Sequence, residues 1–301
     1  MRDVFFIVGP TATGKSELAA DVARDFGAEI VSADAFQIYR GFDLLTAKPD
    51  AATLAKVPHH LIGTMSIREE MNAEKFRTAA LRAIGEIHSR SKPALVVGGS
   101  GLYAKALTHG LSALPKADPK LRAKLNKLSL EELCEKLADV DPETARKIDI
   151  KNRRRLVRAL EICLLTGKRV SVQHKQGNAI TAKGVFAYRD REELYERINS
   201  RVKAMFENGV IEEVRVAGAI SQTASQMIGL REIRQLLDGQ MSILQCIAAI
   251  QQSTRRYAKR QLTWFRRQSN FEPLNLSLLT HNEAVKWITQ KACLAFAAGN
   301  D

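Results

Sequence analysis

Residues 9–16 read Gly9-Pro10-Thr11-Ala12-Thr13-Gly14-Lys15-Ser16, the complete G-x-x-x-x-G-K-S pattern of a phosphate-binding loop. The five apolar residues before it, Val4 to Val8, are typical of a buried parallel strand. The segment after it, Glu17 to Phe26, has helical periodicity and stops at Gly27. This order of strand, glycine-rich loop and helix predicts an α/β fold with a parallel sheet flanked by helices.

The loop combines several groups that bind anions. Its two glycines, Gly9 and Gly14, let the backbone turn its N–H groups inward, and the following helix adds its positive N-terminal dipole. Lys15 supplies a charge for phosphate oxygens, and the Ser16 hydroxyl is placed to bind Mg²⁺ or a phosphate oxygen. We therefore expect residues 9–16 to hold a diphosphate, with Ser16 as a metal ligand.

An acidic residue follows the next predicted strand. Glu29 to Val31 form a short apolar segment that ends at Ser32-Ala33-Asp34. Because ligand groups gather at the carboxyl ends of parallel strands, Asp34 can face the phosphate-binding loop. An ordinary turn aspartate or a helix N-cap explains the same residue equally well.

A second glycine turn follows a third predicted strand, Ala94 to Val97. It reads Gly98-Gly99-Ser100-Gly101-Leu102-Tyr103 and would let backbone approach a ligand with Ser100 aimed at it. A turn that only requires positive φ angles is the alternative. Between Asp34 and this turn, the pattern predicts a helix over residues 72–89 and a short strand at Leu61-Ile62.

The centre of the chain changes character at residues 111–119, where two prolines precede a lysine-rich helical segment. Helices are predicted at residues 119–128, 129–138, 142–147 and 152–166. In the last one, Leu156, Leu160, Cys163 and Leu164 form an apolar stripe, and Arg154, Arg158 and Glu161 line another face. A solvated charged face is the ordinary explanation of such arginines. Strand character returns at residues 185–188, and long helices are expected at 191–208 and 243–267.

The charge distribution points to a polyanionic partner. The chain of 301 residues has 46 Lys plus Arg against 33 Asp plus Glu, a net charge of +13. Residues 116–183 contain 17 basic and 9 acidic residues, and residues 251–267 contain six basic and no acidic ones. These two segments hold the whole excess, which favours nucleic acid.

Composition argues against a membrane protein or a disulfide scaffold. No run of about 18 apolar residues exists, and the first residues enter a strand rather than a signal peptide. The four cysteines lie far apart, and the adjacent His59 and His60 would point to opposite faces of an extended segment, so we assign no zinc site. We expect a cytoplasmic monomer that does not bind a membrane.

Several motifs in one order resemble those of the tRNA dimethylallyltransferase family, also called tRNA isopentenyltransferases. Besides residues 9–16 they are Ser32-Ala33-Asp34-Ala35-Phe36-Gln37-Ile38-Tyr39-Arg40-Gly41, Thr46-Ala47-Lys48-Pro49, Gly98-Gly99-Ser100-Gly101-Leu102-Tyr103, Arg154 to Glu161, and Lys259-Arg260-Gln261-Leu262-Thr263-Trp264. The resemblance covers nearly the whole chain and implies a P-loop α/β core.

The resemblance implies transfer of the dimethylallyl group of dimethylallyl diphosphate to the exocyclic N6 amine of the adenine immediately 3′ of the tRNA anticodon, with Mg²⁺ as cofactor. By it, Asp34 is the base, and Lys15, Ser100 and Arg231 are the other catalytic residues. The residues it places against the tRNA anticodon stem-loop are Asp34, Ala35, Phe36, Gln37, Ser100, Arg122, Arg154, Arg155, Leu156, Val157, Arg158, Gln226, Met227, Ile228, Gly229, Leu230 and Arg231.

The chain departs from the family pattern at a few positions. Ser100 stands where threonine is common, which keeps the hydroxyl, and Leu230 stands where the family has an aromatic residue, which removes a stacking surface. Leu45 replaces a glycine before the Thr-Ala-Lys-Pro segment. We expect these changes to affect fine substrate preference more than the reaction itself.

Three other functions fit parts of the sequence. A small-molecule kinase would use the same loop for ATP, although the basic insert exceeds what a small substrate requires. A prenyltransferase acting on free adenylate would share both the loop and the base. A non-catalytic RNA-binding protein explains the basic helices but gives Lys15, Ser16 and Asp34 no purpose. We expect residues 1–117 and 185–301 to form the catalytic core and residues 118–184 a helical tRNA-binding insertion.

Overall fold

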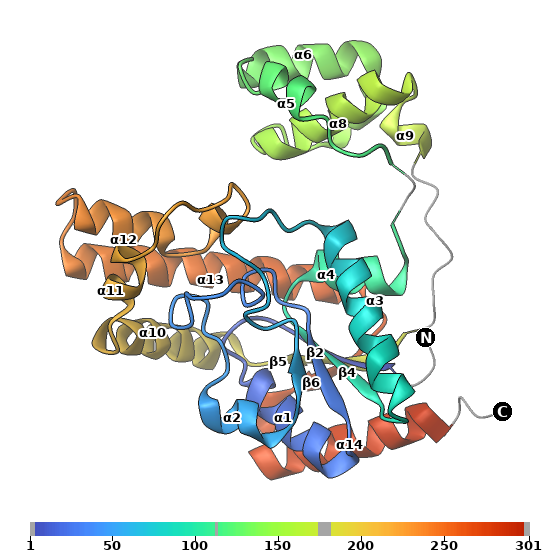
Figure 1. The fold of residues 1–301 in the computed structure, drawn as a ribbon, viewed down its shortest axis with the longest axis vertical. Coiled ribbons are helices and arrows are strands. Elements are labelled where there is room, and N and C mark those ends of the chain that lie inside the picture. Colours follow the sequence, from blue (N-terminus) through green and yellow to red (C-terminus); the bar gives the residue numbers. More distant parts are fainter. Residues whose placement is uncertain (1–3, 112–113, 174–181, 298–301) are drawn as a thin grey trace. The chain divides into compact units, whose positions relative to one another are not determined.

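The computed structural model describes residues 4–111, 114–173 and 182–297. The chain divides into two compact units, residues 1–108 with 180–301 and residues 109–179. Figure 1 labels the helices and strands of both units.

The described residues of the first unit form a six-stranded sheet in the order β3-β2-β4-β1-β5-β6, with every pair parallel. The all-parallel arrangement explains why β1 and β4 are continuous apolar runs, since such strands are buried on both faces. The strands are β1 (Val4–Val8), β2 (Glu29–Ser32), β3 (His59–His60), β4 (Ala94–Gly98), β5 (Lys183–Tyr188) and β6 (Glu272–Asn275). The expectation of a parallel α/β sheet is confirmed.

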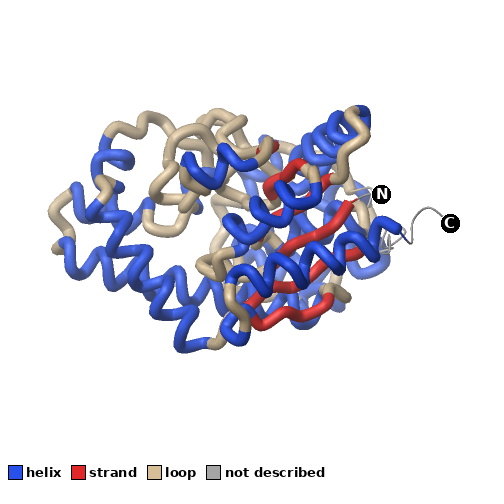
Figure 2. The backbone as a smooth tube through the Cα atoms, turned by 90° about the horizontal axis from the view of Figure 1, so that it is seen from below, coloured by secondary structure: helices blue, strands red, loops and turns tan. Residues whose placement is uncertain are grey.

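Helices cover both faces of this sheet (Figure 2). Alternate strand residues divide between two cores: Phe6 and Val96 pack with one set of helices, and Phe5 and Leu95 with the other. The first set is α3 (Ala73–Ser89), α4 (Gly101–Thr108), α12 (Leu230–Leu237) and α13 (Ile243–Gln268), and the second is α1 (Lys15–Phe26) and α14 (His281–Ala297).

The remaining elements of the first unit are short or lie against these helices. Helix α10 (Arg191–Glu207) packs along α13, and α2 (Ala51–Lys56) packs on α1. The others are α11 (Val210–Arg215) and the 3₁₀ turns η1 (Ala224–Gln226) and η2 (Leu276–Leu278). The strand expected at Leu61-Ile62 is wrong: β3 ends at His60, and Leu61 has a φ of 63°, which an extended strand cannot accommodate.

The second unit is a small helical bundle with its own apolar core. Its helices are α5 (Pro119–Leu125), α6 (Leu130–Val140), α7 (Pro142–Lys147), α8 (Arg153–Thr166) and α9 (Val170–Gln173). Side chains of Asp118, Ser129, Asp141 and Asn152 accept hydrogen bonds from the first turns of α5 to α8 in that order. These N-caps explain why the helices begin where they do.

The charged face expected on α8 needs a correction. Glu161 is completely buried, whereas Leu164 of the predicted apolar stripe is 53% exposed. The Glu161 carboxylate accepts hydrogen bonds from Arg158 of the same helix, and from Arg122 and the backbone N–H of Asp118, two partners from outside the helix that draw it inward.

The same contacts explain where the second unit begins. Arg158 donates to the backbone oxygen of Pro115 at 2.8 Å, and Leu114 packs against the helical core. The segment before Asp118 is therefore held by α8 and belongs to the unit of residues 109–179, which starts earlier than the expected residue 118.

Candidate active site

The phosphate-binding loop joins β1 to α1 at the carboxyl end of the sheet. Gly14 has a φ of 90°, a conformation that favours glycine, and Lys15 begins α1. The Lys15 side chain is only 9% exposed and folds back so that Nζ donates to the Pro10 oxygen at 3.0 Å. Because the first-turn N–H groups of a helix have no intrahelical acceptor, α1 offers Lys15 and Ser16 amides to an anion here.

Arginines on and just before α10 hold this loop from outside. Arg189 Nε donates to the Thr13 oxygen and Arg197 Nε to the Ala12 oxygen, both at 2.9 Å. Arg201 Nη2 donates to Thr11 Oγ1 at 2.9 Å, while its buried Nε has no hydrogen-bond partner among the described residues. That orphaned donor indicates an acceptor that arrives with a ligand.

Sequence reasoning missed these arginines. Their role depends on α10 folding back over a loop about 180 residues earlier in the chain, which no local motif states. The available signal was the spacing of Arg197 and Arg201, which places both on one helix face after β5.

The site is short of negative charge. Burial lowers the pKa of Lys15 to about 8, partly offset by Asp34 and reinforced by Arg201. Burial likewise lowers the pKa of Arg201 to about 10, with Asp34 opposing the shift and Arg197 adding to it. A dianionic or trianionic ligand would favour the charged forms of both side chains and so oppose these shifts, which suits this site to a phosphate group.

Asp34 lies beside this loop. The backbone bonds Ala33 N–H to Val97 oxygen (2.7 Å) and Gly9 N–H to Gly98 oxygen (3.2 Å) bring the ends of β1, β2 and β4 together. Asp34 Oδ1 accepts from the Phe36 N–H at 2.9 Å, which is the turn role considered from sequence. Among the described residues Oδ2 has no hydrogen-bond partner, so one carboxylate oxygen remains available for a substrate proton.

Ser100 shares this edge of the sheet. Its N–H donates to the Ala33 oxygen at 3.3 Å, and it immediately precedes α4. The structure therefore brings together the loop, Lys15, Asp34 and Ser100, all of which the sequence singled out.

The residues after Asp34 have mixed surroundings. Ala35 and Phe36 are half-buried against the core. Gln37 donates through Nε2 to the Ala47 oxygen at 2.9 Å and thereby fixes the Thr-Ala-Lys-Pro segment. Lys48 of that segment is itself held by the Tyr39 and Gly41 oxygens and by Asp43. A nucleotide contact by Ala35, Phe36 or Gln37 stays a prediction.

The predicted segment Gln226 to Arg231 runs from η1 into the first turn of α12 and packs against the N-terminal half of α13, where a Cβ built on Gly229 would lie 3.2 Å from Ile250. Met227 and Leu230 are buried in the core and Ile228 is half-buried, and a tRNA contact by any of the three stays a prediction. Gln226 and Arg231 are exposed, and the catalytic role of Arg231 stays a prediction.

The predicted tRNA-binding residues of the second unit fall into three groups. Leu156 and Val157 belong to its apolar core, so their side chains are not available as surface contacts. Arg122 and Arg158 are partly exposed and paired with Glu161. Arg154 and Arg155 are exposed on the first turn of α8 and are the two that offer free surface charge to a polyanion.

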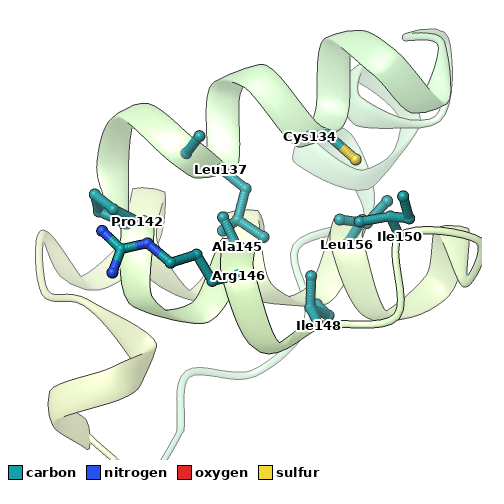
Figure 3. Close-up of a pocket in the computed structure, with 9 residues that line it drawn as sticks. Cys134, Leu137, Pro142, Ala145, Arg146, Ile148, Ile150 and Leu156 are labelled. Atoms are coloured by element: carbon teal, nitrogen blue, oxygen red, sulfur yellow. The ribbon is translucent and has the colours of Figure 1, made fainter.

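A separate cavity of about 290 Å³ lies within the second unit (Figure 3). Its walls are mainly apolar and come from α6, α7, the segment after α7, and α8, with Cys134 and Arg146 as the polar or reactive members. Among its lining residues Arg146 could bind an anion, but none is a carboxylate or a histidine.

Comparison with known proteins identifies the family. The model of the IPP transferase family matches residues 37–268. The chain belongs to the IPP transferase family. It is 44% identical over 275 residues to "tRNA dimethylallyltransferase 1" of Citrifermentans bemidjiense, covering 89% of this chain and 90% of that protein.

Solved structures agree with this assignment. The full-length tRNA isopentenylpyrophosphate transferase of Bacillus halodurans superimposes with a TM-score of 0.73 at 34% identity, covering 100% of this chain and 98% of that one. A eukaryotic dimethylallyltransferase described as acting on tRNA has a TM-score of 0.79 at 26% identity, over 95% of this chain and 77% of that one. The family expected from the sequence motifs is confirmed. None of the helices in the described ranges has the length and apolar character needed to cross a bilayer.

Proposed function

We propose that this enzyme transfers the dimethylallyl group from dimethylallyl diphosphate to N6 of the adenine immediately 3′ of the tRNA anticodon. The observation that carries the proposal is the cation-rich loop of residues 9–16 placed next to a carboxylate with one unused oxygen. The loop suits a diphosphate leaving group, and the carboxylate suits an amine that must lose a proton. The names of the related proteins give the same substrate class.

In the proposed reaction the N6 lone pair attacks C1 of the allyl group, and the bond from C1 to the diphosphate oxygen breaks. The leaving diphosphate takes that electron pair, and its charge is stabilised by Lys15, Arg201 and the first-turn amides of α1. The N6 proton passes to the free oxygen of Asp34. General-base catalysis of this kind typically contributes about 10²- to 10⁴-fold in rate.

Magnesium fits the donor side of this site. The Ser16 hydroxyl lies in the first turn of α1 and has no hydrogen-bond partner among the described residues, and Mg²⁺ prefers a few oxygen ligands together with substrate phosphates. Ser16 would hold the ion. When bound, Mg²⁺ adds positive charge where the diphosphate leaves.

The tRNA would meet the basic surfaces of the chain, Arg154 and Arg155 on α8 and Arg256, Lys259 and Arg260 on α13, all exposed. Recognition of tRNA phosphates by such residues is sequence-independent and salt-dependent. We also propose that the enzyme works as a monomer in the cytoplasm, where its tRNA substrate is available.

One experiment tests the reaction and its rivals. The wild-type protein is incubated with Mg²⁺ and dimethylallyl diphosphate or ATP, and with an unmodified anticodon stem-loop, AMP or buffer, and nucleosides are analysed by mass. We expect prenylated adenosine only with the diphosphate donor and the stem-loop. Prenylated AMP would favour the free-adenylate enzyme, and phosphoryl transfer from ATP without prenylation would favour a kinase.

The variant Asp34→Asn tests whether Asp34 is the general base. Asn keeps the shape and the hydrogen bond to the Phe36 N–H but cannot accept the proton, so turnover should fall about 10²- to 10⁴-fold with stem-loop affinity unchanged within a few-fold. A turnover of Asp34→Asn within threefold of wild type would contradict the role of base.

A further inference from the structure

A glutamine of α13 holds the phosphate-binding loop against the second glycine turn. Gln261 Oε1 accepts from the Thr11 N–H at 2.9 Å, and its Nε2 donates to the Gly99 oxygen at 2.8 Å. The side chain is 5% exposed, and its two partners lie 250 and 162 residues away in the chain. One amide of α13 thus bridges the phosphate-binding loop and the second glycine turn.

The chemistry of the two partners fixes the identity of this residue. Thr11 presents a donor and Gly99 an acceptor, so the bridging group must accept on one side and donate on the other. Glutamine does both at this length. A carboxylate only accepts, and an apolar side chain leaves a buried donor and a buried acceptor unpaired.

Neighbouring groups restrict the position of the Gln261 side chain. A Cβ added at Gly99 would lie 2.3 Å from Gln261 Nε2, so the glycine is what lets the amide reach the backbone. One helical turn earlier, the Tyr257 side chain interacts with Gln261. Thr11 is in turn held by Arg201 through its hydroxyl. The bridge is therefore packed on each side.

We propose that Gln261 is a positioning residue that sets the distance between the donor's diphosphate and the Ser100 and Asp34 side of the active site. The proposal rests on the proposed function. The loop binds the leaving group, and the Gly99 turn is tied to the Asp34 strand through Ser100 N–H to Ala33 oxygen. Because Gln261 spans these two parts, it fixes the leaving group relative to the base.

Gln261→Leu is the first test, with Gln251→Leu as its matched control. Gln251 lies on the same helix and also donates to a backbone oxygen, that of Asn199 at 3.2 Å, but does not touch the loop. We expect Gln261→Leu to weaken binding of inorganic diphosphate, measured by calorimetry without tRNA, by about 10- to 100-fold. KM for the allyl donor should rise with it, with KM for the stem-loop within threefold of wild type.

Gln261→Glu supplies a readout that a purely structural role would not move. Its carboxylate still accepts from Thr11 but cannot donate to the Gly99 oxygen, whereas the protonated form can do both. The defect in donor KM relative to wild type should therefore shrink as the pH falls toward the pKa of the introduced carboxylic acid, while the defect of Gln261→Leu stays constant. Gly99→Ala, which displaces the amide by crowding, should reproduce the loss seen in Gln261→Leu.

The outcomes separate this proposal from the proposed reaction. Diphosphate affinity of Gln261→Leu within twofold of Gln251→Leu would overturn the positioning role, whatever the protein catalyses. If circular dichroism shows that Gln261→Leu does not fold, the donor KM of Gln261→Glu and Gly99→Ala tests the proposal instead. A donor KM within twofold of wild type in both variants would overturn it. Wild-type protein that binds diphosphate but prenylates no stem-loop would refute the reaction alone.

Discussion

Binding of the allyl diphosphate should draw a proton onto Lys15. Burial holds the pKa of this amine at about 8, against an ordinary value of 10.5. A bound diphosphate favours the charged form, so the pKa returns toward or above its ordinary value. At pH 9 the free enzyme carries about 0.1 proton on Lys15 and the complex about one, which predicts an uptake of about 0.9 proton.

The same shift predicts the pH dependence of affinity. A lowered lysine pKa means that the binding-competent charged form is nearly complete at pH 7 and is lost as the pH rises through 8. Affinity for the donor should therefore fall about tenfold between pH 7 and pH 9, and proton uptake at pH 7 should be only about 0.1.

Isothermal calorimetry in two buffers of different ionisation enthalpy measures the uptake directly. Dimethylallyl diphosphate is titrated without tRNA, so that no turnover occurs. Lys15→Arg is the control, because arginine keeps the positive charge and does not titrate in this range. Protons exchanged by the ligand itself are common to both proteins and cancel in the difference. An uptake at pH 9 that is equal in the two proteins would refute the reasoning.

Three further results are expected. Arg154 and Arg155 are exposed on α8, and replacing either by Ala should reduce the slope of log stem-loop affinity against log salt concentration by about 1. Diphosphate affinity should not change. An unchanged slope would contradict the phosphate contacts. Burial works against ionisation of Glu161, but the hydrogen bonds from Arg122 and Arg158 keep its pKa below the ordinary 4.5. Glu161→Gln should therefore lower the free energy of unfolding by about 2–4 kcal/mol at pH 7, measured by urea titration. The difference from wild type should shrink below pH 4.5. Phe36→Ala should raise KM for the stem-loop at least threefold in the folded fraction, and a change in stability alone would make Phe36 a core residue only.

The parts of the site that local sequence encodes were predictable. The glycines, Lys15 and Ser16 form one contiguous motif whose geometry follows from a strand and a helix on either side. Asp34 and Ser100 each follow a strand directly, and parallel strands gather their carboxyl ends.

The residues that support this motif were not predictable, because each acts across a large separation in the chain. Arg197 lay in a predicted helix, Arg189 just before it, and Gln261 in the Lys259 to Trp264 motif of another predicted helix. Nothing local states that α10 and α13 fold against residues 11–13. Glu161 shows the converse error. Helical spacing assigned it to solvent with the arginines, but Arg122 of α5 and the backbone N–H of Asp118 draw it into the interior.

The pairing of β1 has a consequence for the order in which the molecule is made. β1 is the first strand of the chain, but it lies between β4 and β5, pairing Val4 with Ala94 and Phe5 with Lys183. On a ribosome adding roughly 5 to 20 residues per second, β5 emerges about 4 to 18 s after β4. During that interval one edge of β1 is unpaired. The helices of residues 119–166 have their apolar core and N-caps within their own unit, so they can fold before β5 is made. The nascent chain can therefore complete the helical unit of residues 109–179 before the loop of residues 9–16, which gains its contact with Gln261 only when that residue leaves the exit tunnel.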